Sequence, residues 1–324
     1  MKKIGISGSS GFLGTWLTKR LQRDFDLVLL TRNNENFKNL KNSFPNISVK
    51  IIDWNSTDNI EENLKDVEIL IHAGAMLPTR ASANDKEIIN SSLNIVENIN
   101  KSKIKLGKLI FISTLRTCIS SNEEYFSDDS EYNFFKYDTQ YGRSKFLTEK
   151  FLKNNYNFPL IICAPAHIIG PERVEIAKSN DVIFKMFNKK ILFITRAKYS
   201  IVHISDVCEC IYKIIQLDIS MGKYLIANQN PTLEEIANIV EEIDGIKKTK
   251  IIIPLFIINI MSLFFEMLNR ILNLKNIPLN RSTYHFIKLF KDFRGIRVKE
   301  LNITFKNTKE MIKEIYEFKN TKGQ

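Results

Sequence analysis

Short apolar runs alternate with amphipathic segments through the first half of the chain. The runs have the length of strands, and the segments between them, such as Phe12–Leu21 and Ile88–Ile99, repeat apolar residues at helical spacing. The expected strands are Lys3–Ser7, Leu27–Thr31, Ser48–Ile52, Glu68–His72, Lys108–Ser113 and Leu160–Ala164. This alternation predicts an α/β fold, a Rossmann-type doubly wound parallel sheet with helices on both faces.

The alternation weakens in the second half of the chain. Ile201–Ile215 predicts a short strand that leads into a helix, and Pro231–Ile243 predicts another helix. We expect a dinucleotide-binding domain at residues 1–165 and a smaller carboxyl-terminal substrate lobe at residues 166–324. Segments around residues 200–228 are expected to return to the Rossmann core.

One strongly apolar stretch, Ile251–Phe265, falls in the second half. It is shorter than the roughly 20 apolar residues of a membrane span, and Pro254 and Asn259 interrupt it. We expect a helix that is buried or packs within the lobe. The alternative is a monotopic contact with a membrane surface, next to the basic carboxyl-terminal residues.

The first expected strand is joined to the first expected helix by a glycine-rich loop, Gly8-Ser9-Ser10-Gly11-Phe12-Leu13-Gly14. Spaced glycines permit a tight turn and let the backbone approach a pyrophosphate, while the helix amino terminus offers N–H groups and a positive dipole end. The strand before the loop and the helix after it are the context that this motif requires. The loop therefore predicts dinucleotide binding.

The end of the second expected strand bears on which dinucleotide is bound. NAD enzymes place an acid there to hold the ribose 2′-OH, whereas this chain has Thr31-Arg32-Asn33 and no acid before Glu35. An arginine guanidinium suits a 2′-phosphate. We therefore expect NADP(H) rather than NAD(H), with Arg32 as a binding residue. The alternative is that Arg32 is an ordinary surface residue.

Tyr141 and Lys145 are four positions apart, so a helix places the phenol and the ammonium on one face. A nearby ammonium lowers the pKa of a phenol toward the range that suits proton transfer. Tyr132 and Tyr284 also precede a lysine by four positions, but only Tyr141 leads into an amphipathic helix directly before the sixth expected strand. We interpret the other two pairs as coincidences.

The fifth expected strand ends in Ser113-Thr114 and brings two hydroxyls to the carboxyl edge of the sheet, where the ligands of such sheets bind. We expect Thr114 to hydrogen-bond the substrate carbonyl oxygen, with Ser113 as the alternative. A hydroxyl at a strand end also serves as an ordinary turn or helix cap.

With further motifs, the chain resembles the extended short-chain dehydrogenases/reductases of the NAD(P)-dependent epimerase/dehydratase family over nearly its whole length. These motifs are the glycine loop, Asp53-Trp54, Ile71-His72-Ala73-Gly74-Ala75, Asn90, Tyr141-Gly142-Arg143-Ser144-Lys145 and residues 164–171, 201–207, 222–226 and 231–236. The resemblance implies that Tyr141 is the general acid/base. It also implies that Lys145 lowers the pKa of Tyr141 and holds the nicotinamide ribose, and that Thr114 orients the substrate oxygen.

The same resemblance implies a set of cofactor contacts. These are Gly8, Ser10, Gly11, Phe12, Leu13 and Gly14 at the phosphates, Asp53 and Trp54 by the adenine, Ala73, Gly74 and Ala75 along the cofactor, and Pro165 and Ile168 beside the nicotinamide. Departures from the family pattern occur at Ala164, where an arginine is common, and near the end of the chain. The 4,6-dehydratases carry Asp-Glu after the strand-end threonine; Leu115-Arg116 stands there here, which disfavours dehydration.

Composition narrows the partners and the compartment. The net charge is +11, and residues 281–322 hold 11 Lys and Arg against 5 Asp and Glu. No nucleic-acid-binding module accompanies this charge, so a solvated helix face, an anionic substrate or a membrane surface are the interpretations left open. The four scattered cysteines predict reduced thiols, no metal site and a cytoplasmic protein, and the amino terminus does not read as a signal peptide.

These features predict an NADP(H)-dependent oxidoreductase that acts on a C–OH/C=O centre, foremost a reductase of a keto sugar carried on a nucleoside diphosphate. A nucleotide-sugar epimerase with retained NAD and a membrane-associated hydroxysteroid- or lipid-type dehydrogenase are the enzymatic alternatives. A non-catalytic NADP-sensing protein is the alternative from another class. The resemblance also suggests a homodimer paired through the helices around residues 84–102 and 139–155.

Overall fold

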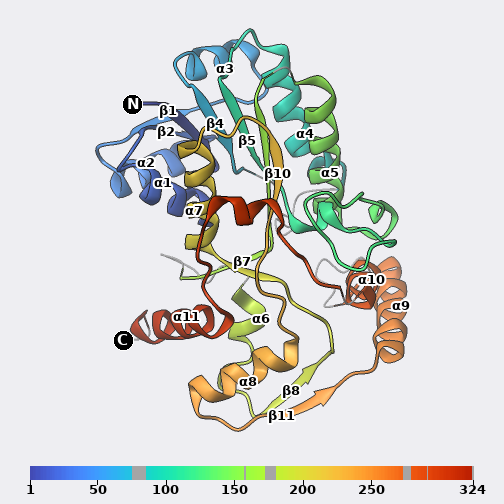
Figure 1. Cartoon of the computed structure of the whole chain (residues 1–324). Coiled ribbons are helices and arrows are strands. Elements are labelled where there is room, and N and C mark those ends of the chain that lie inside the picture. Colours follow the sequence, from blue (N-terminus) through green and yellow to red (C-terminus); the bar gives the residue numbers. More distant parts are fainter. Residues whose placement is uncertain (75–84, 157, 172–179, 273–278, 290, 323–324) are drawn as a thin grey trace.

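The computed structural model of the chain describes residues 1–74, 85–156, 158–171, 180–272, 279–289 and 291–322. Its main element is a seven-stranded sheet in which all pairings are parallel (Figure 1). In order across the sheet the strands are β3 (Ser48–Ile51), β2 (Asp26–Thr31), β1 (Lys3–Ser7), β4 (Ile69–His72), β5 (Lys108–Ile112), β6 (Leu160–Pro165) and β10 (Gly222–Ile226). The strand order reverses at β1, with β4 on its other side, so the predicted doubly wound fold is confirmed.

Helices cover both faces of this sheet. On one face lie α1 (Phe12–Leu21), α2 (Asn34–Ser43) and α7 (Ile204–Gln216), and on the other lie α3 (Thr57–Leu64), α4 (Asp85–Lys101) and α5 (Gln140–Asn155) (Figure 1). Successive strand residues alternate between two cores: Leu27 and Leu29 join one cluster, and Val28 and Leu30 join the other. Burial on both faces explains why the central strands are mostly apolar runs in the sequence.

The carboxyl-terminal lobe lies at the carboxyl edge of the sheet (Figure 1). Two small parallel pairs belong to it, β7 (His167–Ile169) with β9 (Ile201–His203) and β8 (Ile191–Ile194) with β11 (Thr249–Ile252). Its helices are α6 (Asp181–Phe184), α8 (Leu233–Asp244), α9 (Leu255–Leu272), α10 (Arg281–Leu289) and α11 (Thr308–Lys322). The short helices η1 (Leu115–Cys118), η2 (Phe135–Tyr137) and η4 (Arg297–Leu301) lie in the connections.

The apolar stretch Ile251–Phe265 contributes to a helix that packs within the lobe on one side, as one form of the expectation had it, but that helix is not buried. Pro254 divides it into the end of β11 and the beginning of α9. Phe256 and Ile260 of α9 are 65% and 61% exposed, so one side of this helix faces solvent with apolar side chains. Within the ranges that the structure describes, no helix is both long enough and apolar enough to cross a membrane.

Candidate active site

The glycine-rich loop closes tightly between β1 and α1. Gly8 has a φ of +72°, and a Cβ there would lie 2.7 Å from the backbone nitrogen of Gly74. A Cβ at Gly14 would lie 2.1 Å from the carbonyl oxygen of Gly8. Both positions therefore require glycine, since the loop packs against the end of β4 on one side and against α1 on the other.

The amino terminus of α1 is built differently from those of its neighbours. Its N-cap is Gly11, which offers no side-chain cap, whereas Asn33, Ser56 and Thr139 cap α2, α3 and α5 with side-chain oxygens. A helix terminus without a side-chain cap presents its first N–H groups and the positive end of its dipole to an anion. This loop therefore fits the pyrophosphate of a dinucleotide.

The residues expected at the adenosine end follow β2 and β3 directly. Arg32 is exposed one residue beyond β2. Asp53 is also exposed, and its Oδ1 accepts from the backbone N–H of Asn55 at 3.0 Å. The Trp54 side chain, by contrast, is 6% exposed and packs at 5.9 Å between ring centroids on His72. A contact of Trp54 with an adenine would therefore use the backbone rather than the indole.

The other expected cofactor residues lie along the same edge of the sheet. Ala73 continues β4 and donates its N–H to the Ser7 carbonyl at 3.2 Å, and Ala75 lies outside the described residues. Pro165 ends β6, and Ile168 is half-buried in β7, where it pairs with Val202 of β9.

Lys145 ties α5 to the end of β5. Its Nζ donates to the carbonyl oxygen of Ile112 at 2.7 Å and lies 6.0 Å from the ring centroid of Tyr141. Thr114, two residues beyond Ile112, is 9% exposed and accepts the N–H of Arg116 at 3.5 Å. One lysine contact thus brings the helix that carries Tyr141 against the strand end that carries Thr114.

The protonation of this pair differs from the expectation. Burial raises the pKa of Tyr141 to about 12, and the opposing charge comes from Arg116 rather than from Lys145. Burial lowers the pKa of Lys145 to about 7, against the attraction of the Glu149 carboxylate. The neighbouring charge that opposes the effect of burial on the Tyr141 pKa is therefore that of Arg116, whereas the i,i+4 spacing suggested Lys145.

A buried carboxylate, Glu149, engages the alternative hydroxyl. The Ser113 hydroxyl donates to its Oε1, as does Thr117 Oγ1 at 2.6 Å. Lys223 of β10 donates from Nζ to its Oε2 at 2.9 Å, and both charged side chains are more than nine-tenths buried. Ser113 is thus part of a structural network, which leaves Thr114 as the better candidate for a substrate hydroxyl.

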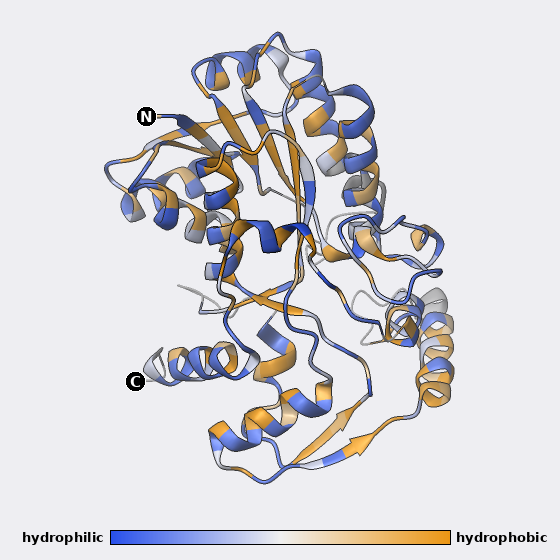
Figure 2. Cartoon of the chain, in the orientation of Figure 1, coloured by the Kyte–Doolittle hydropathy of each residue, from blue (hydrophilic) through white to orange (hydrophobic). Residues whose placement is uncertain are grey.

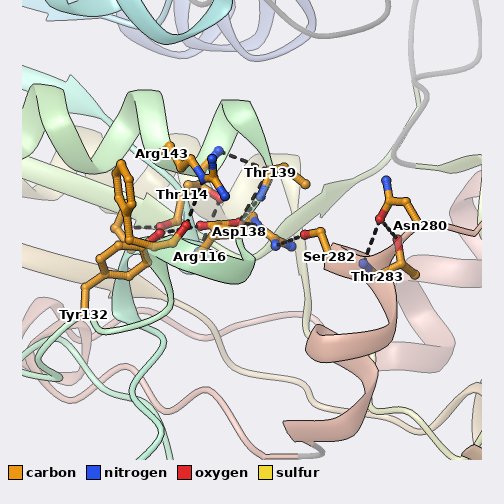
Figure 3. A network of polar contacts seen from close by, with 12 residues as sticks. Thr114, Arg116, Tyr132, Asp138, Thr139, Arg143, Asn280, Ser282 and Thr283 are labelled. Atoms are coloured by element: carbon orange, nitrogen blue, oxygen red, sulfur yellow. Dashed lines mark hydrogen bonds and ion pairs between the residues drawn. The ribbon is translucent and has the colours of Figure 1, made fainter. Parts of the chain in front are cut away.

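A second buried pair joins the same region to the lobe (Figure 3). Arg116 of η1 donates from Nε to Oδ1 of Asp138 at 2.5 Å, and from Nη2 to the Ser282 hydroxyl of α10 at 3.2 Å. Asp138 Oδ1 also accepts the N–H of Thr139, the N-cap of α5, at 2.7 Å, and its Oδ2 accepts the Tyr132 hydroxyl at 2.8 Å. Tyr132 therefore has a structural partner of its own.

Comparison with known proteins decides the family. The model of the NAD dependent epimerase/dehydratase family matches residues 4–227, which is more than half of the chain. The chain belongs to this family. The relatives found in this family are NAD(P)-dependent reductases or epimerases that act on small molecules, and the chain is an enzyme of this family.

Similarity to individual members of the family covers different shares of the chain. A dihydroflavonol 4-reductase of Gerbera hybrida is 24% identical over 74% of this chain and 72% of that protein. A putative UDP-glucose 4-epimerase of Methanocaldococcus jannaschii is 26% identical over 46% of this chain and 50% of that protein. The structure of Gre2 from Candida albicans in complex with NADPH superimposes with a TM-score of 0.75 at 16% identity and covers 100% of both chains.

Sequence reasoning missed both ion pairs described above for the candidate site, Glu149 with Lys223 and Arg116 with Asp138. Glu149 follows Lys145 by one helical turn, and that spacing was the only local sign that it faces the site. Its partner Lys223 is 74 residues away, and Arg116 is 22 residues from Asp138. Gly142 also marks the position of Asp138. A Cβ at Gly142 would lie 2.1 Å from Oδ2 of Asp138, so the close approach of this carboxylate requires a glycine there.

Proposed function

We propose that the enzyme is an NADP(H)-dependent reductase that converts a carbonyl group of a small organic substrate to an alcohol. The observation that carries this proposal is the bond from Lys145 Nζ to the Ile112 carbonyl, which brings Tyr141 and Thr114 to one edge of the sheet. These three residues are the proposed catalytic set.

The cofactor supplies a hydride when it is bound, and the protein supplies the proton. A Tyr141 with a pKa near 12 is protonated at neutral pH, the form that a reduction needs from its acid. Thr114 is proposed to hydrogen-bond the substrate oxygen and orient it. Lys145 uses one N–H donor on the Ile112 carbonyl, so its amino group is proposed to contact the nicotinamide ribose with another.

NADP(H) is preferred in this proposal because of Arg32. It is the first residue after β2, it is exposed, and no acid precedes Glu35 in that loop. A guanidinium at this point pairs with a 2′-phosphate through two parallel hydrogen bonds. The remaining proposed contacts are the loop residues Gly8, Ser10, Gly11, Phe12, Leu13 and Gly14, with Asp53, Trp54, Ala73, Gly74, Ala75, Pro165 and Ile168.

A reductase is favoured over an epimerase because the similarity to reductases covers more of the chain. The resemblance to the Gerbera reductase covers 74% of the chain, whereas that to the archaeal epimerase covers 46%. A nucleotide-sugar epimerase that retains NAD stays the second candidate. A keto sugar on a nucleoside diphosphate and a carbonyl compound without a nucleotide are the two substrate classes to be separated.

Cofactor identity is the first test. The protein is purified without added nucleotide, denatured, and any released nucleotide is identified by mass spectrometry; binding of NADPH and NADH is then titrated to the wild type and to Arg32→Ala. We expect an empty protein that prefers NADPH, and an Arg32→Ala variant that loses on the order of tenfold or more of that preference. Stoichiometric NAD⁺ from the wild type would instead support the epimerase.

Turnover is the second test. NADPH oxidation is followed with keto sugar nucleotides and with nucleotide-free ketones, for the wild type, Tyr141→Phe and Tyr284→Phe. Tyr284 also precedes a lysine by four positions, so Tyr284→Phe is a matched control. We expect Tyr141→Phe to bind NADPH normally and to lose roughly 10²-fold or more in kcat, with Tyr284→Phe active. Full activity of Tyr141→Phe contradicts the proposal.

A further inference from the structure

Helix α9 turns its apolar face outward. Five side chains at positions i, i+4, i+7, i+8 and i+11 share one side of the helix and are half or more exposed: Phe256 65%, Ile260 61%, Leu263 50%, Phe264 52% and Met267 54%. A surface helix of a globular protein has the opposite arrangement, with its apolar stripe against the core.

Two polar residues of α9, Asn259 and Ser262, face the protein instead. Arg281 of α10 donates from Nη1 to Asn259 Oδ1 at 2.5 Å and to the Ser262 hydroxyl at 3.4 Å. Ser262 is fully buried, and Ile258 beside it is 2% exposed. The helix is therefore anchored by hydrogen bonds on its inner side, and its orientation is specific.

The strand pair that leads into α9 repeats this pattern. In β8, Leu192 and Ile194 are 5% and 4% exposed, whereas Ile191 and Phe193 are 54% and 69% exposed. Ile251 of β11, the register partner of Phe193, is 43% exposed. Figure 2 shows the hydrophobic colouring running along β8, β11 and α9. We call the exposed apolar residues of these three elements the lobe apolar surface.

The segments that carry the lobe apolar surface are basic. Residues 182–205 and 245–265 contain eight Lys and Arg residues and no Asp or Glu. Lys185, Lys198, Lys248 and Lys250 pair with acids from outside these segments. The others, Lys189, Lys190, Arg196 and Lys247, are exposed.

We propose that the lobe apolar surface binds the interface of an anionic lipid bilayer, with α9 lying in the membrane plane. An anionic bilayer offers acyl chains for the phenylalanines and phosphate groups for the lysines. A second copy of the chain fits less well, since a two-fold contact through the same patch brings the basic segments of both copies together. This proposal is independent of the proposed reductase activity.

Vesicle sedimentation tests the proposal with the full-length protein. Sucrose-loaded vesicles of phosphatidylcholine alone, or of phosphatidylcholine mixed with phosphatidylglycerol, are pelleted with the wild type and with Phe256→Ser/Phe264→Ser. The control is Leu217→Ser/Met221→Ser, which alters two apolar residues that are 55% and 73% exposed elsewhere. We expect the wild type and the control to pellet with the anionic vesicles, and the α9 variant to lose on the order of tenfold or more in partitioning.

A charge-reversal series tests the proposed attraction between the basic residues and anionic lipid. It does not depend on the α9 variant. Lys189→Glu/Lys190→Glu/Lys247→Glu should lose binding to anionic vesicles, and added salt should weaken the wild type. Lys38→Glu/Lys65→Glu/Lys101→Glu, at exposed lysines of the Rossmann domain, should bind normally. A wild type that stays in the supernatant with both vesicle types overturns the proposal. So does a lipid-free dimer that Phe256→Ser/Phe264→Ser converts to a monomer, because the occupant is then a second copy.

Discussion

The Arg116 guanidinium and the Asp138 carboxylate form a nearly buried ion pair, with Nε and Oδ1 2.5 Å apart and the two side chains 15% and 0% exposed. Asp138 also receives the N–H of Thr139 at the start of α5, and Arg116 reaches Ser282 of α10. The pair therefore connects the end of β5, the helix that carries Tyr141 and the carboxyl-terminal lobe (Figure 3). The charge of Arg116 also lowers the pKa of Tyr141 against the effect of burial.

Replacing Arg116 should change both stability and the balance of the two reaction directions. Arg116→Gln leaves the Asp138 carboxylate buried without its cation, which should reduce the free energy of unfolding by on the order of 3 kcal/mol. Removing the positive charge raises the pKa of Tyr141, so less phenolate is present at any pH. The kcat of alcohol oxidation with NADP⁺ should therefore fall more than the kcat of carbonyl reduction. Arg116→Lys keeps the charge and should keep the wild-type ratio of the two kcat values. If Arg116→Gln lowers kcat equally in both directions, this role of Arg116 is contradicted.

Ser113 and Thr114 should separate into a structural and a catalytic hydroxyl. Ser113→Ala removes one donor from the Glu149 network and should lower the free energy of unfolding by about 1–3 kcal/mol, with little change in kcat. Thr114→Val should instead lower kcat by about 10²–10³-fold, since it removes the proposed bond to the substrate oxygen. Urea unfolding and steady-state kinetics on both variants make the comparison. Rescue of kcat by Thr114→Ser is expected, and a kcat defect confined to Ser113→Ala would reverse the assignment.

The glycine loop should tolerate a methyl group at one position and not at another. A Cβ at Gly14 meets the Gly8 carbonyl oxygen at 2.1 Å, so Gly14→Ala must displace the loop; at Gly11 the same contact is 3.3 Å. We expect Gly14→Ala to lower the free energy of unfolding by roughly 1–3 kcal/mol, and Gly11→Ala by well under that. Thermal denaturation measures the difference, and NADPH titration should show the larger loss in Gly14→Ala. Equal melting of the two variants would exclude the steric explanation.

His72 should make the protein sensitive to acid. Burial, with the charges of Lys145 and Arg32 adding to it, lowers the pKa of His72 to about 3 from 6.5. Between these values the unfolded chain binds a proton that the folded chain does not, so stability falls as the pH drops below about 6.5. This group alone should remove about 1.4 kcal/mol between roughly pH 7.5 and pH 5.5.

Urea unfolding of the wild type and of His72→Asn at the two pH values measures this contribution. Asparagine retains a polar group near the Ser7 hydroxyl, which lies 2.7 Å from His72 Nδ1. The difference in the free energy of unfolding between the two pH values should be smaller in the variant by about 1.4 kcal/mol, even where its stability is lower at both pH values. An unchanged pH slope would mean that His72 does not titrate in this way.

The sequence by itself determined most of the sheet and the glycine loop at its carboxyl edge. Five of the six expected strands were visible because each is buried on both faces and so forms a mostly apolar run, whereas β3 is a partly exposed edge strand. The glycine loop was visible because the glycines that permit the tight turn and the close packing of β1 on α1 lie within seven consecutive residues. The choice of Tyr141 over Tyr132 and Tyr284 followed from the helix that comes after it, and the structure adds that Tyr132 hydrogen-bonds Asp138.

Only the tertiary structure decided which distant polar residues meet and which side of α9 faces out. Glu149 with Lys223, and Arg116 with Asp138, are ordinary charged residues in the sequence, and the packing of β10 and η1 against α5 makes them partners. The apolar stretch of α9 has the composition of a buried helix. One side of it is exposed because two of its polar residues, Asn259 and Ser262, bond Arg281 on the inner side. The local sequence pattern shows which residues share a face of a helix or strand. Whether that face is buried or exposed depends on contacts between segments far apart in the chain.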